Sequence, residues 1–466
     1  MFIGREKELE SLNELYSRNA FHLFILYGRR RIGKTTLLSE FCKDKENIFF
    51  AAQQDTSKGN LALFSDSIFS HFKETGLSPF TTWSNALTYL NGKSKEKPLV
   101  VVIDEFPYIA KADKKILSEL QNLIDHTLKK GNLFLILCGS YVSFMETKVL
   151  AEKSPLFGRR TGQLKLKPFD YQDSIRFMKG FSPEDKLNLY GAVGGTAQYL
   201  EKINRKQSFR QNIKNLYLSP SSYLYEEPDL LLRQEIQEPA VYNAIFEAIA
   251  SGCSKSGDIA NKIGEENAKC IKYLKTLCNL GFVKKEIPFG EKGAKRKAIY
   301  SIGDFMFRFW YRYIFSGKTL IETNAGDILY SRKIAGEHYN QYMGLVFETV
   351  CREFLLRENA RGKLPILFTK IGRWWGPDPK KKQEEEIDIV ANDGNEYLFC
   401  ECKWQNTKAG PDVLQRLKER ADLVQQNRKR TYFVLFSKSG FTETLVQEAR
   451  KDKHIKLYTL ADLRLE

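Results

Sequence analysis

A short glycine-containing loop constrains the fold of this chain more than any other stretch. It follows the apolar run FHLFILY at residues 21–27, precedes a helical pattern, and has the sequence GRRRIGKTT. The spacing of Gly28, Gly33, Lys34 and Thr35 is the consensus of a phosphate-binding loop. Glycines let backbone N–H groups approach phosphate oxygens, the lysine reaches the terminal phosphates, and the threonine hydroxyl faces Mg²⁺. We therefore expect a parallel sheet that binds ATP through Gly28, Arg29, Arg30, Arg31, Ile32, Gly33, Lys34, Thr35 and Thr36.

A second apolar run ends in two acidic residues. Residues 99–103 are LVVVI, and Asp104 and Glu105 follow directly. An uninterrupted apolar run is typical of a parallel strand covered on both faces. With a phosphate-binding loop in the same chain, we expect Asp104 to hold Mg²⁺ together with Thr35. Glu105 is expected to polarise the water that attacks the γ-phosphate.

Three more residues are candidates for contact with ATP. The apolar run NLFLILCGS at residues 132–140 ends at Ser140, and SPLFGRRTG contains Arg159 and Arg160. A polar residue at the end of a core strand can sense the γ-phosphate, although a simple turn residue gives the same pattern. One arginine can act as a finger or signalling residue; contact with DNA or with water is equally compatible with the sequence.

Several segments of the first half together resemble the archaeal-type AAA+ ATPases, close to the STAND class. They span residues 1–235 and are FIGREKEL, GRRRIGKTT, VVVIDEFPYI, LCGS, LFGRRTG, LKPF and YGAVGGTAQYL. The resemblance implies that Gly4 and Arg5 lie near the adenine base. It also implies that the glycine pair in YGAVGGTAQYL belongs to a helical lid, with Ala197 where family members often carry proline.

From about residue 236 the pattern changes to short amphipathic helices. AVYNAIFEAIASG, KSGDIANKIG and ENAKCIKYLKTLCNLG precede FVKKEIPFGEKGAKRKAIYSI, which predicts a hairpin with a basic tip. Three helices and a hairpin resemble a winged helix-turn-helix, which can hold DNA phosphates or serve as a protein contact or brace. The basic residues expected at DNA are Lys284, Lys285, Lys292, Lys295, Arg296 and Lys297. The aromatic segment at residues 304–315 is expected to be a packed connecting helix.

The stretch YLFCECKWQ, residues 397–405, combines a charge pair with cysteines. Strand alternation places Glu401 and Lys403 on one face and the cysteines on the other, as core packing behind the charge pair. Alone, the pair is simply a solvated face. However, EIDIVA and the turn sequence NDG precede it and predict a hairpin that brings Asp388 near Glu401 and Lys403. The helix before this hairpin contains Glu348.

These four residues resemble the core of PD-(D/E)XK nucleases, with Asp388, Glu401 and Lys403 at the motif positions. Carboxylate oxygens suit Mg²⁺, so the resemblance implies Asp388 and Glu401 as metal ligands. It implies Lys403 as the group that stabilises charge at the phosphate, with Glu348 also in the catalytic set. Gln415, on the later helical pattern GPDVLQRL, fits the position of a glutamine in some resolvase-like members.

Composition narrows the class of protein. The net charge of +16 favours a polyanionic partner, most simply DNA, although a basic ATPase that binds no DNA is compatible with it. The eight cysteines are dispersed without a CxxC pair, which predicts reduced thiols and no zinc site. No apolar run approaches the ~20 residues of a membrane span, and charges appear by Arg5. We expect a cytoplasmic protein without a membrane partner; a homo-oligomer or a protein partner stays open.

The expected fold class is α/β: a P-loop NTPase sheet with a helical lid, a winged helix, and a restriction-endonuclease-like α/β domain. The predicted boundaries are 1–165 for the ATPase core, 166–235 for the lid, 236–318 for the winged helix and aromatic connector, and 319–466 for the nuclease-like domain. The predicted function is ATP hydrolysis coupled to a Mg²⁺-dependent DNA endonuclease. One alternative is a STAND-like regulatory switch whose last domain binds DNA or protein without cutting. Another is a sequence-specific DNA-binding regulator.

Overall fold

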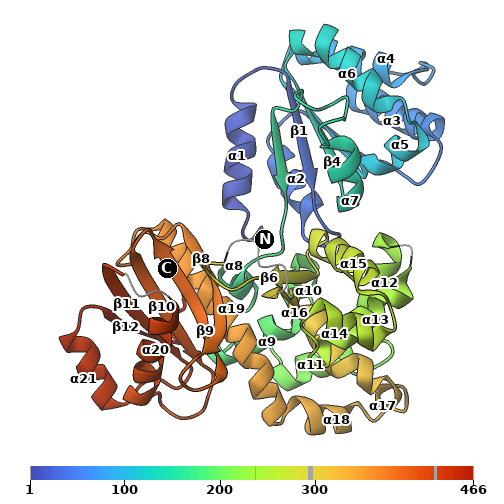
Figure 1. The fold of residues 1–466 in the computed structure, drawn as a ribbon. Coiled ribbons are helices and arrows are strands. Elements are labelled where there is room, and N and C mark those ends of the chain that lie inside the picture. Colours follow the sequence, from blue (N-terminus) through green and yellow to red (C-terminus); the bar gives the residue numbers. More distant parts are fainter. Residues whose placement is uncertain (1, 237, 292–296, 425–427, 465–466) are drawn as a thin grey trace. The chain divides into compact units, whose positions relative to one another are not determined.

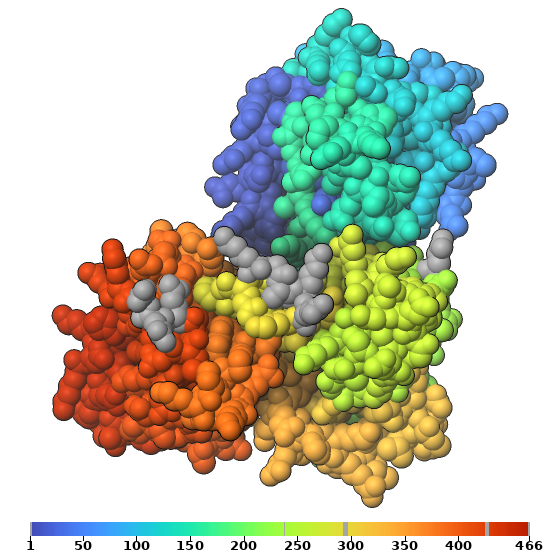
Figure 2. Space-filling model, in the orientation of Figure 1, coloured from blue at the N-terminus to red at the C-terminus, as the bar shows by residue number. Residues whose placement is uncertain are grey.

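The computed structural model describes residues 2–236, 238–291, 297–424 and 428–464. The chain divides into two compact units (Figures 1 and 2). Unit 1 comprises residues 1–169 and 196–198, and unit 2 comprises residues 170–195 and 199–466. In Figure 2 the red surface of unit 2 is formed by the last strands and helices of the chain.

Unit 1 is built on a five-stranded sheet in which every neighbouring pair is parallel. The strand order is β2-β3-β4-β1-β5. The three central strands are buried along their whole length, as their uninterrupted apolar runs predict. The strands are β1 (His22–Tyr27), β2 (Asn47–Ala51), β3 (Leu99–Asp104), β4 (Leu133–Gly139) and β5 (Gly162–Lys165).

Helices cover both faces of this sheet. Leu12 of α1 and Leu37 and Phe41 of α2 pack in one core cluster with alternate residues of β1, β3 and β4, and α3 to α6 lie on the other side (Figure 1). The helices are α1 (Glu6–Tyr16), α2 (Lys34–Cys42), α3 (Ser57–Phe72), α4 (Trp83–Ser94), α5 (Phe106–Ala112), α6 (Ile116–His126) and α7 (Val142–Phe144). This α/β layering with a parallel sheet is the architecture that the phosphate-binding loop predicts.

The first half of unit 2 is mostly helical. Three of its helices, α13 (Pro239–Ala250), α14 (Ser256–Ile263) and α15 (Asn267–Asn279), are followed by the antiparallel pair β6 (Val283–Glu286) and β7 (Ile299–Ile302). The aromatic segment expected as a packed helix is buried, including Phe307, Phe309 and Trp310. The other helices of this half are α8 (Tyr171–Ser174), α9 (Pro183–Val193), α10 (Ala197–Leu200), α11 (Phe209–Tyr217), α12 (Glu227–Glu235), α16 (Phe305–Phe309), α17 (Lys318–Glu322) and α18 (Gly326–Leu329).

The second half of unit 2 contains a mixed five-stranded sheet, in the order β12-β11-β10-β9-β8. The pairs β8–β9 and β9–β10 are antiparallel, whereas β10–β11 and β11–β12 are parallel. The strands are β8 (Lys370–Asp378), β9 (Gln383–Asp393), β10 (Glu396–Lys403), β11 (Arg430–Ser437) and β12 (Ile455–Thr459). The helices are α19 (Glu337–Ala360), α20 (Pro411–Val424) and α21 (Glu443–Lys451). The NDG turn joins β9 and β10 as predicted, with Asp393 opposite Glu396.

Two expectations from composition can be compared with the fold. All eight cysteines are free thiols. Within the described ranges, no helix is both long enough and apolar enough to cross a bilayer.

Candidate functional site

The phosphate-binding loop of unit 1 joins β1 to α2 and depends on glycine. Gly28 and Gly33 have φ of +154° and +92°, values that residues with a side chain rarely adopt. A Cβ on Gly28 would lie 2.5 Å from the carbonyl oxygen of Leu166. The loop backbone is therefore packed too closely for any larger residue at this position.

Lys34 and Thr35 begin α2, and each has a defined partner. The Nζ of Lys34 donates to the carbonyl oxygens of Gly28 and Arg29, both over 2.9 Å. The Oγ1 of Thr35 donates to Oδ2 of Asp104 over 3.0 Å. Asp104 is the last residue of β3, and the carboxyl ends of parallel strands meet at one edge of the sheet. A hydroxyl and a carboxylate facing one another are oxygen ligands of the kind that Mg²⁺ prefers, so these residues fit the cation of Mg-ATP.

Glu105 and Ser140 meet at the same edge of the sheet, from β3 and from the end of β4. The Oγ of Ser140 donates to Oε1 of Glu105 over 2.5 Å, and its backbone N–H donates to Oε2 over 3.3 Å. Glu105 has a left-handed backbone with φ of +52°, a conformation uncommon outside glycine and often found at functional positions. The carboxylate expected to activate water is thus held by the residue expected to sense the γ-phosphate.

The N-terminal segment is fixed against the phosphate-binding loop. Arg5 donates to the carbonyl oxygens of Lys167 over 2.5 Å and of Ile32 over 3.3 Å, and its guanidinium lies 4.1 Å from the centre of the Phe169 ring. Gly4 has φ of +70°, and a Cβ there would lie 2.7 Å from the same ring. The structure places both predicted residues beside the loop, in contact with protein atoms.

The remaining arginines of unit 1 have different surroundings. Arg30 donates to the hydroxyl of Tyr108 over 3.2 Å, and the carbonyl of Arg31 accepts from the backbone N–H of Gln198. Arg159 forms an ion pair with Asp125 at 2.7 Å. The guanidinium of Arg160 lies 5.3 Å from the ring of Phe157. Thr36 is exposed on α2.

In unit 2 the four nuclease-like residues form two groups, Glu348 with Asp388 and Glu401 with Lys403. Beyond the last β9–β10 pair, the backbone N–H of Cys402 donates to Oδ2 of Asp388 over 2.8 Å. Lys403 donates to Oε1 of Glu401 over 2.6 Å. Arg420 of α20 also donates to Glu401, at 3.3 and 3.4 Å. Glu401 therefore has two cationic partners.

The two groups approach the sheet from different faces. Glu401 and Lys403 point toward α20, whereas Cys402 points toward Cys351 of α19, with which it interacts. Glu348 belongs to α19 and lines a cavity of unit 2 together with Asp388; neither Glu401 nor Lys403 is among that cavity's lining residues. The face of β10 that carries Cys400 and Cys402 was expected to pack into the core behind the site. In the structure α19 covers that face, so Glu348, a residue of α19, also lies on that side.

Burial and mutual repulsion disfavour the charged forms of two of these acids. Burial raises the pKa of Glu348 to about 7, and nearby Arg373 opposes the shift while Glu386 adds to it. Burial, followed by the charges of Glu348 and Glu401, raises the pKa of Asp388 well above its usual range. The three acids thus lie within one another's electrostatic field.

Both predicted metal ligands, Asp388 and Glu401, have hydrogen-bond partners within the protein. Within the described ranges, no three His, Cys, Asp or Glu side chains are grouped so that they could hold a metal ion. The oxygens of Glu401 are engaged by an ammonium and a guanidinium. A positive charge is thus already supplied to Glu401 by protein groups.

Sequence reasoning missed the cationic partners of the acids. Arg420 joins Glu401 to Glu385, whose carboxylate it binds at 2.7 Å, and Arg373 binds Glu386 at 2.5 Å. Gln415, the residue of α20 expected at the site, is exposed and bonds Glu419 instead. Of the expected DNA contacts, Lys292, Lys295 and Arg296 lie outside the described residues.

Comparison with known proteins gives the family. Residues 2–203 match a family described as an ATPase domain predominantly from Archaea, and residues 310–416 match a family of archaeal and bacterial proteins of unknown function. Uncharacterized protein MJECL04 of Methanocaldococcus jannaschii is 36% identical over 413 residues, which cover 88% of both chains. This chain belongs to the MJECL04 family. In this member of the MJECL04 family, an archaeal P-loop ATPase domain, as predicted here, is combined with a C-terminal sheet domain.

Two proteins of Pyrococcus abyssi are also similar to this chain. Uncharacterized ATP-binding protein PYRAB09480 of Pyrococcus abyssi is 24% identical over 270 residues, covering 49% of this chain and 79% of its own. The solved Walker-type ATPase paby2304 of Pyrococcus abyssi has a TM-score of 0.50 at 20% identity, covering 67% of this chain and 96% of its own. The likeness to the solved ATPase is evidence about the fold alone.

Proposed function

We propose that this protein is an ATP hydrolase associated with DNA, in which the nucleotide state of unit 1 regulates what the C-terminal sheet of unit 2 does to nucleic acid. The observation that supports ATP hydrolysis best is the 3.0 Å hydrogen bond between Thr35 and Asp104. It joins the phosphate-binding loop to the strand end that carries the water-activating Glu105. The groups required for phosphoryl transfer thus lie together at one edge of the sheet.

Each residue of this edge has a separate role in hydrolysis. Lys34 exchanges its two loop carbonyl partners for the β- and γ-phosphate oxygens. Thr35 and Asp104 would hold Mg²⁺, which when bound would neutralise charge that develops on the phosphates. Glu105 orients the attacking water and accepts its proton. Ser140 holds Glu105 and, at the end of β4, is placed to respond to a γ-phosphate.

Three observations support DNA as the partner. The chain has a net charge of +16, which favours a polyanion. Helices α13 to α15 followed by the β6–β7 hairpin have the element order of a winged helix-turn-helix. Lys269, Lys272 and Lys275 are exposed on α15, the helix that such a module lays in the major groove.

Metal-dependent cleavage of DNA is the second candidate function. The order α19–β8–β9–β10–α20–β11 resembles the core of PD-(D/E)XK nucleases, and Asp388, Glu401 and Lys403 lie near the point where β9 and β10 part. The ion pair of Glu401 with Arg420 favours the regulatory alternative, because it satisfies the acid without a metal. Binding of nucleic acid without cleavage is therefore the first candidate function of the C-terminal domain.

The ATPase proposal is tested by steady-state hydrolysis with and without DNA. The Lys34→Ala variant is expected to lose ATP binding and hydrolysis together. DNA is expected to change the hydrolysis rate of the wild type. Tightly retained ADP with very slow turnover that DNA leaves unchanged would instead favour a switch independent of DNA.

Cleavage is tested with supercoiled, linear and branched DNA, each with Mg²⁺ or Mn²⁺ and with or without ATP. We expect no difference between the wild type and Lys403→Ala. Cutting by the wild type that Lys403→Ala abolishes, with ATP hydrolysis intact, would establish the second candidate and displace the first.

A further inference from the structure

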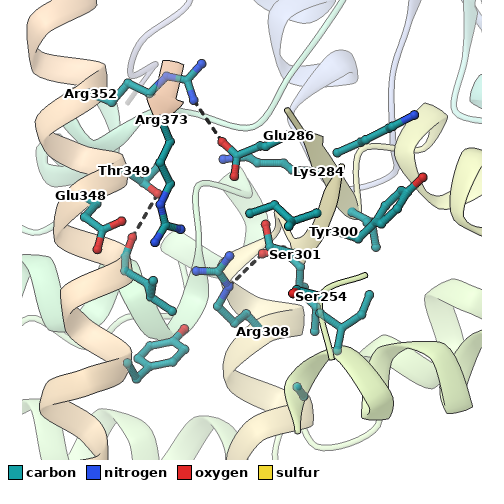
Figure 3. Close-up of a pocket in the computed structure, with 18 of the residues that line it drawn as sticks. Ser254, Lys284, Glu286, Tyr300, Ser301, Arg308, Glu348, Thr349, Arg352 and Arg373 are labelled. Atoms are coloured by element: carbon teal, nitrogen blue, oxygen red, sulfur yellow. Dashed lines mark hydrogen bonds and ion pairs between the residues drawn. The ribbon is translucent and has the colours of Figure 1, made fainter. Parts of the chain in front are cut away.

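A cavity of about 920 Å³ lies within unit 2, between the β6–β7 hairpin, α16, α19 and the β8–β9 strands (Figure 3). It is lined by six basic side chains and four acidic ones. The basic residues are Lys284, Lys285, Arg308, Arg312, Arg352 and Arg373, and the acidic residues are Glu286, Glu348, Glu353 and Asp388. The lining is thus rich in charge with an excess of cations.

Two of the cations form no direct ion pair with any residue in the described part of the chain. Arg308 uses its Nε to donate to the carbonyl oxygen of Ile302 over 2.8 Å, and no described residue accepts a hydrogen bond from its two terminal nitrogens. Lys284 has no hydrogen-bond or ion-pair partner among the described residues. Both side chains extend toward the cavity in Figure 3. Placing two unpaired cations in a shared recess is unfavourable, and an anionic ligand would offset this repulsion.

Among the described residues, the acids of the lining act on these two cations only through charge attraction, without a direct ion pair: Glu286 and Glu353 attract Lys284, and Glu348 and Glu286 attract Arg308. Glu286 pairs with Arg352 at 3.4 Å. Glu353 accepts from the backbone N–H of Tyr171 and from the hydroxyl of Tyr190, at 2.9 and 3.3 Å. On the far wall, the Nε of Arg373 is buried without a partner. The guanidinium group is planar and suits bidentate contact with phosphate oxygens.

The size of the cavity limits the form of the ligand. Its volume lies within the range of roughly 300–1,000 Å³ that is usual for pockets holding small ligands. A duplex segment, whose two strands flank a major groove of about 12 Å, does not fit within this volume. A flexible single strand can place one phosphate after another inside it.

We propose that this cavity binds a single-stranded segment of nucleic acid through its phosphates, with Arg308 and Lys284 as the contacting cations, and that it excludes duplex. The inference rests on the proposed association with DNA and adds the form of strand that unit 2 receives. A free nucleotide offers the same phosphate chemistry, so the experiment must separate the two sources.

The test measures binding to the full chain by fluorescence anisotropy over a salt series. The probe is a labelled oligothymidylate of about ten nucleotides, within the range of site sizes of single-strand binders. The competitors are the matched duplex and thymidine monophosphate. Arg308→Gln, Lys284→Gln and the double variant are compared with Lys206→Gln, which removes an exposed charge outside the cavity. Thermal melting checks that each variant is folded.

We expect the double variant to bind the single strand roughly tenfold more weakly or worse, with a salt slope smaller by about 1.4, because each lost phosphate contact removes ~0.7 from the slope. Lys206→Gln should match the wild type. Equal competition by duplex, or affinity and slope unchanged in the double variant, would overturn the inference while leaving DNA association intact. Equal competition by thymidine monophosphate would overturn the assignment to a strand. Failure of every DNA form to bind would overturn both this inference and the proposed function.

Discussion

The hydroxyl of Ser140 donates to the carboxylate of Glu105 over 2.5 Å, and this bond links the ends of two neighbouring strands of unit 1. Glu105 is the acid of the ATP site that is proposed to accept a proton from water, and this task needs a free oxygen. The Ser140 hydroxyl occupies an oxygen of Glu105 that must turn to the water. We therefore expect the Ser140–Glu105 bond to slow hydrolysis.

Ser140→Ala is expected to raise the basal rate of ATP hydrolysis by about tenfold, since a hydrogen bond to a charged group contributes ~1.5 kcal/mol. The measurement is kcat and KM for ATP without DNA, with Ser143→Ala, a serine on the adjacent α7, as the control. A fall in kcat would show that Ser140 positions Glu105 productively.

Glu105→Gln is expected to lower kcat by a factor of roughly 10²–10⁴, the usual contribution of a general base. ATP binding should persist, because Lys34, Thr35 and Asp104 are untouched. Binding of a fluorescent ATP analogue and single-turnover hydrolysis separate these effects. Loss of binding equal to that of Lys34→Ala would contradict the role assigned to Glu105.

Glu353 makes the stability of unit 2 depend on pH. Burial, with the charge of Asp170, raises its pKa from an ordinary 4.5 to about 7, while the Tyr171 N–H and Lys284 oppose the shift. The folded state therefore binds a proton more tightly than the unfolded state, and this contribution to stability falls as the pH rises from about 4.5 to 7.

Glu353→Gln is expected to match the wild type in Tm near pH 4.5 and to exceed it at pH 8, by a stability difference on the order of 2 kcal/mol. Melting curves across this pH range provide the measurement. Equal Tm values for the two proteins at pH 8 would show that Glu353 ionises in the fold without penalty.

Arg420→Gln is expected to destabilise unit 2 by about 3 kcal/mol, because Glu401 and Glu385 are both buried and lose a shared cation. Mn²⁺ should restore part of the lost Tm in this variant and should leave the wild type unchanged. Arg420→Lys, which keeps the charge, is the control. Stabilisation of the wild type by Mn²⁺ to the same extent would mean that the acids already hold a metal, and would favour the nuclease candidate.

The sequence by itself determined the local chemistry of this protein. The loop from Gly28 to Thr35, the buried strand before Asp104 and the NDG turn each follow from backbone rules that act over a few residues. For that reason the parallel sheet of unit 1, the joining of Thr35 to Asp104 and the β9–β10 hairpin were predictable.

Only the tertiary structure decided how the C-terminal acids are divided. Alternation along β10 points Glu401 toward α20, but which helix covers which face depends on the packing of the whole sheet. An irregularity in the β8–β9 register between Gly372 and Trp374 also changes how β9 faces its neighbours. Arg420 reaches Glu401, and Glu348 shares a cavity with Asp388, because separate helices pack on opposite faces of one sheet. Such long-range packing has no short-range pattern in the sequence.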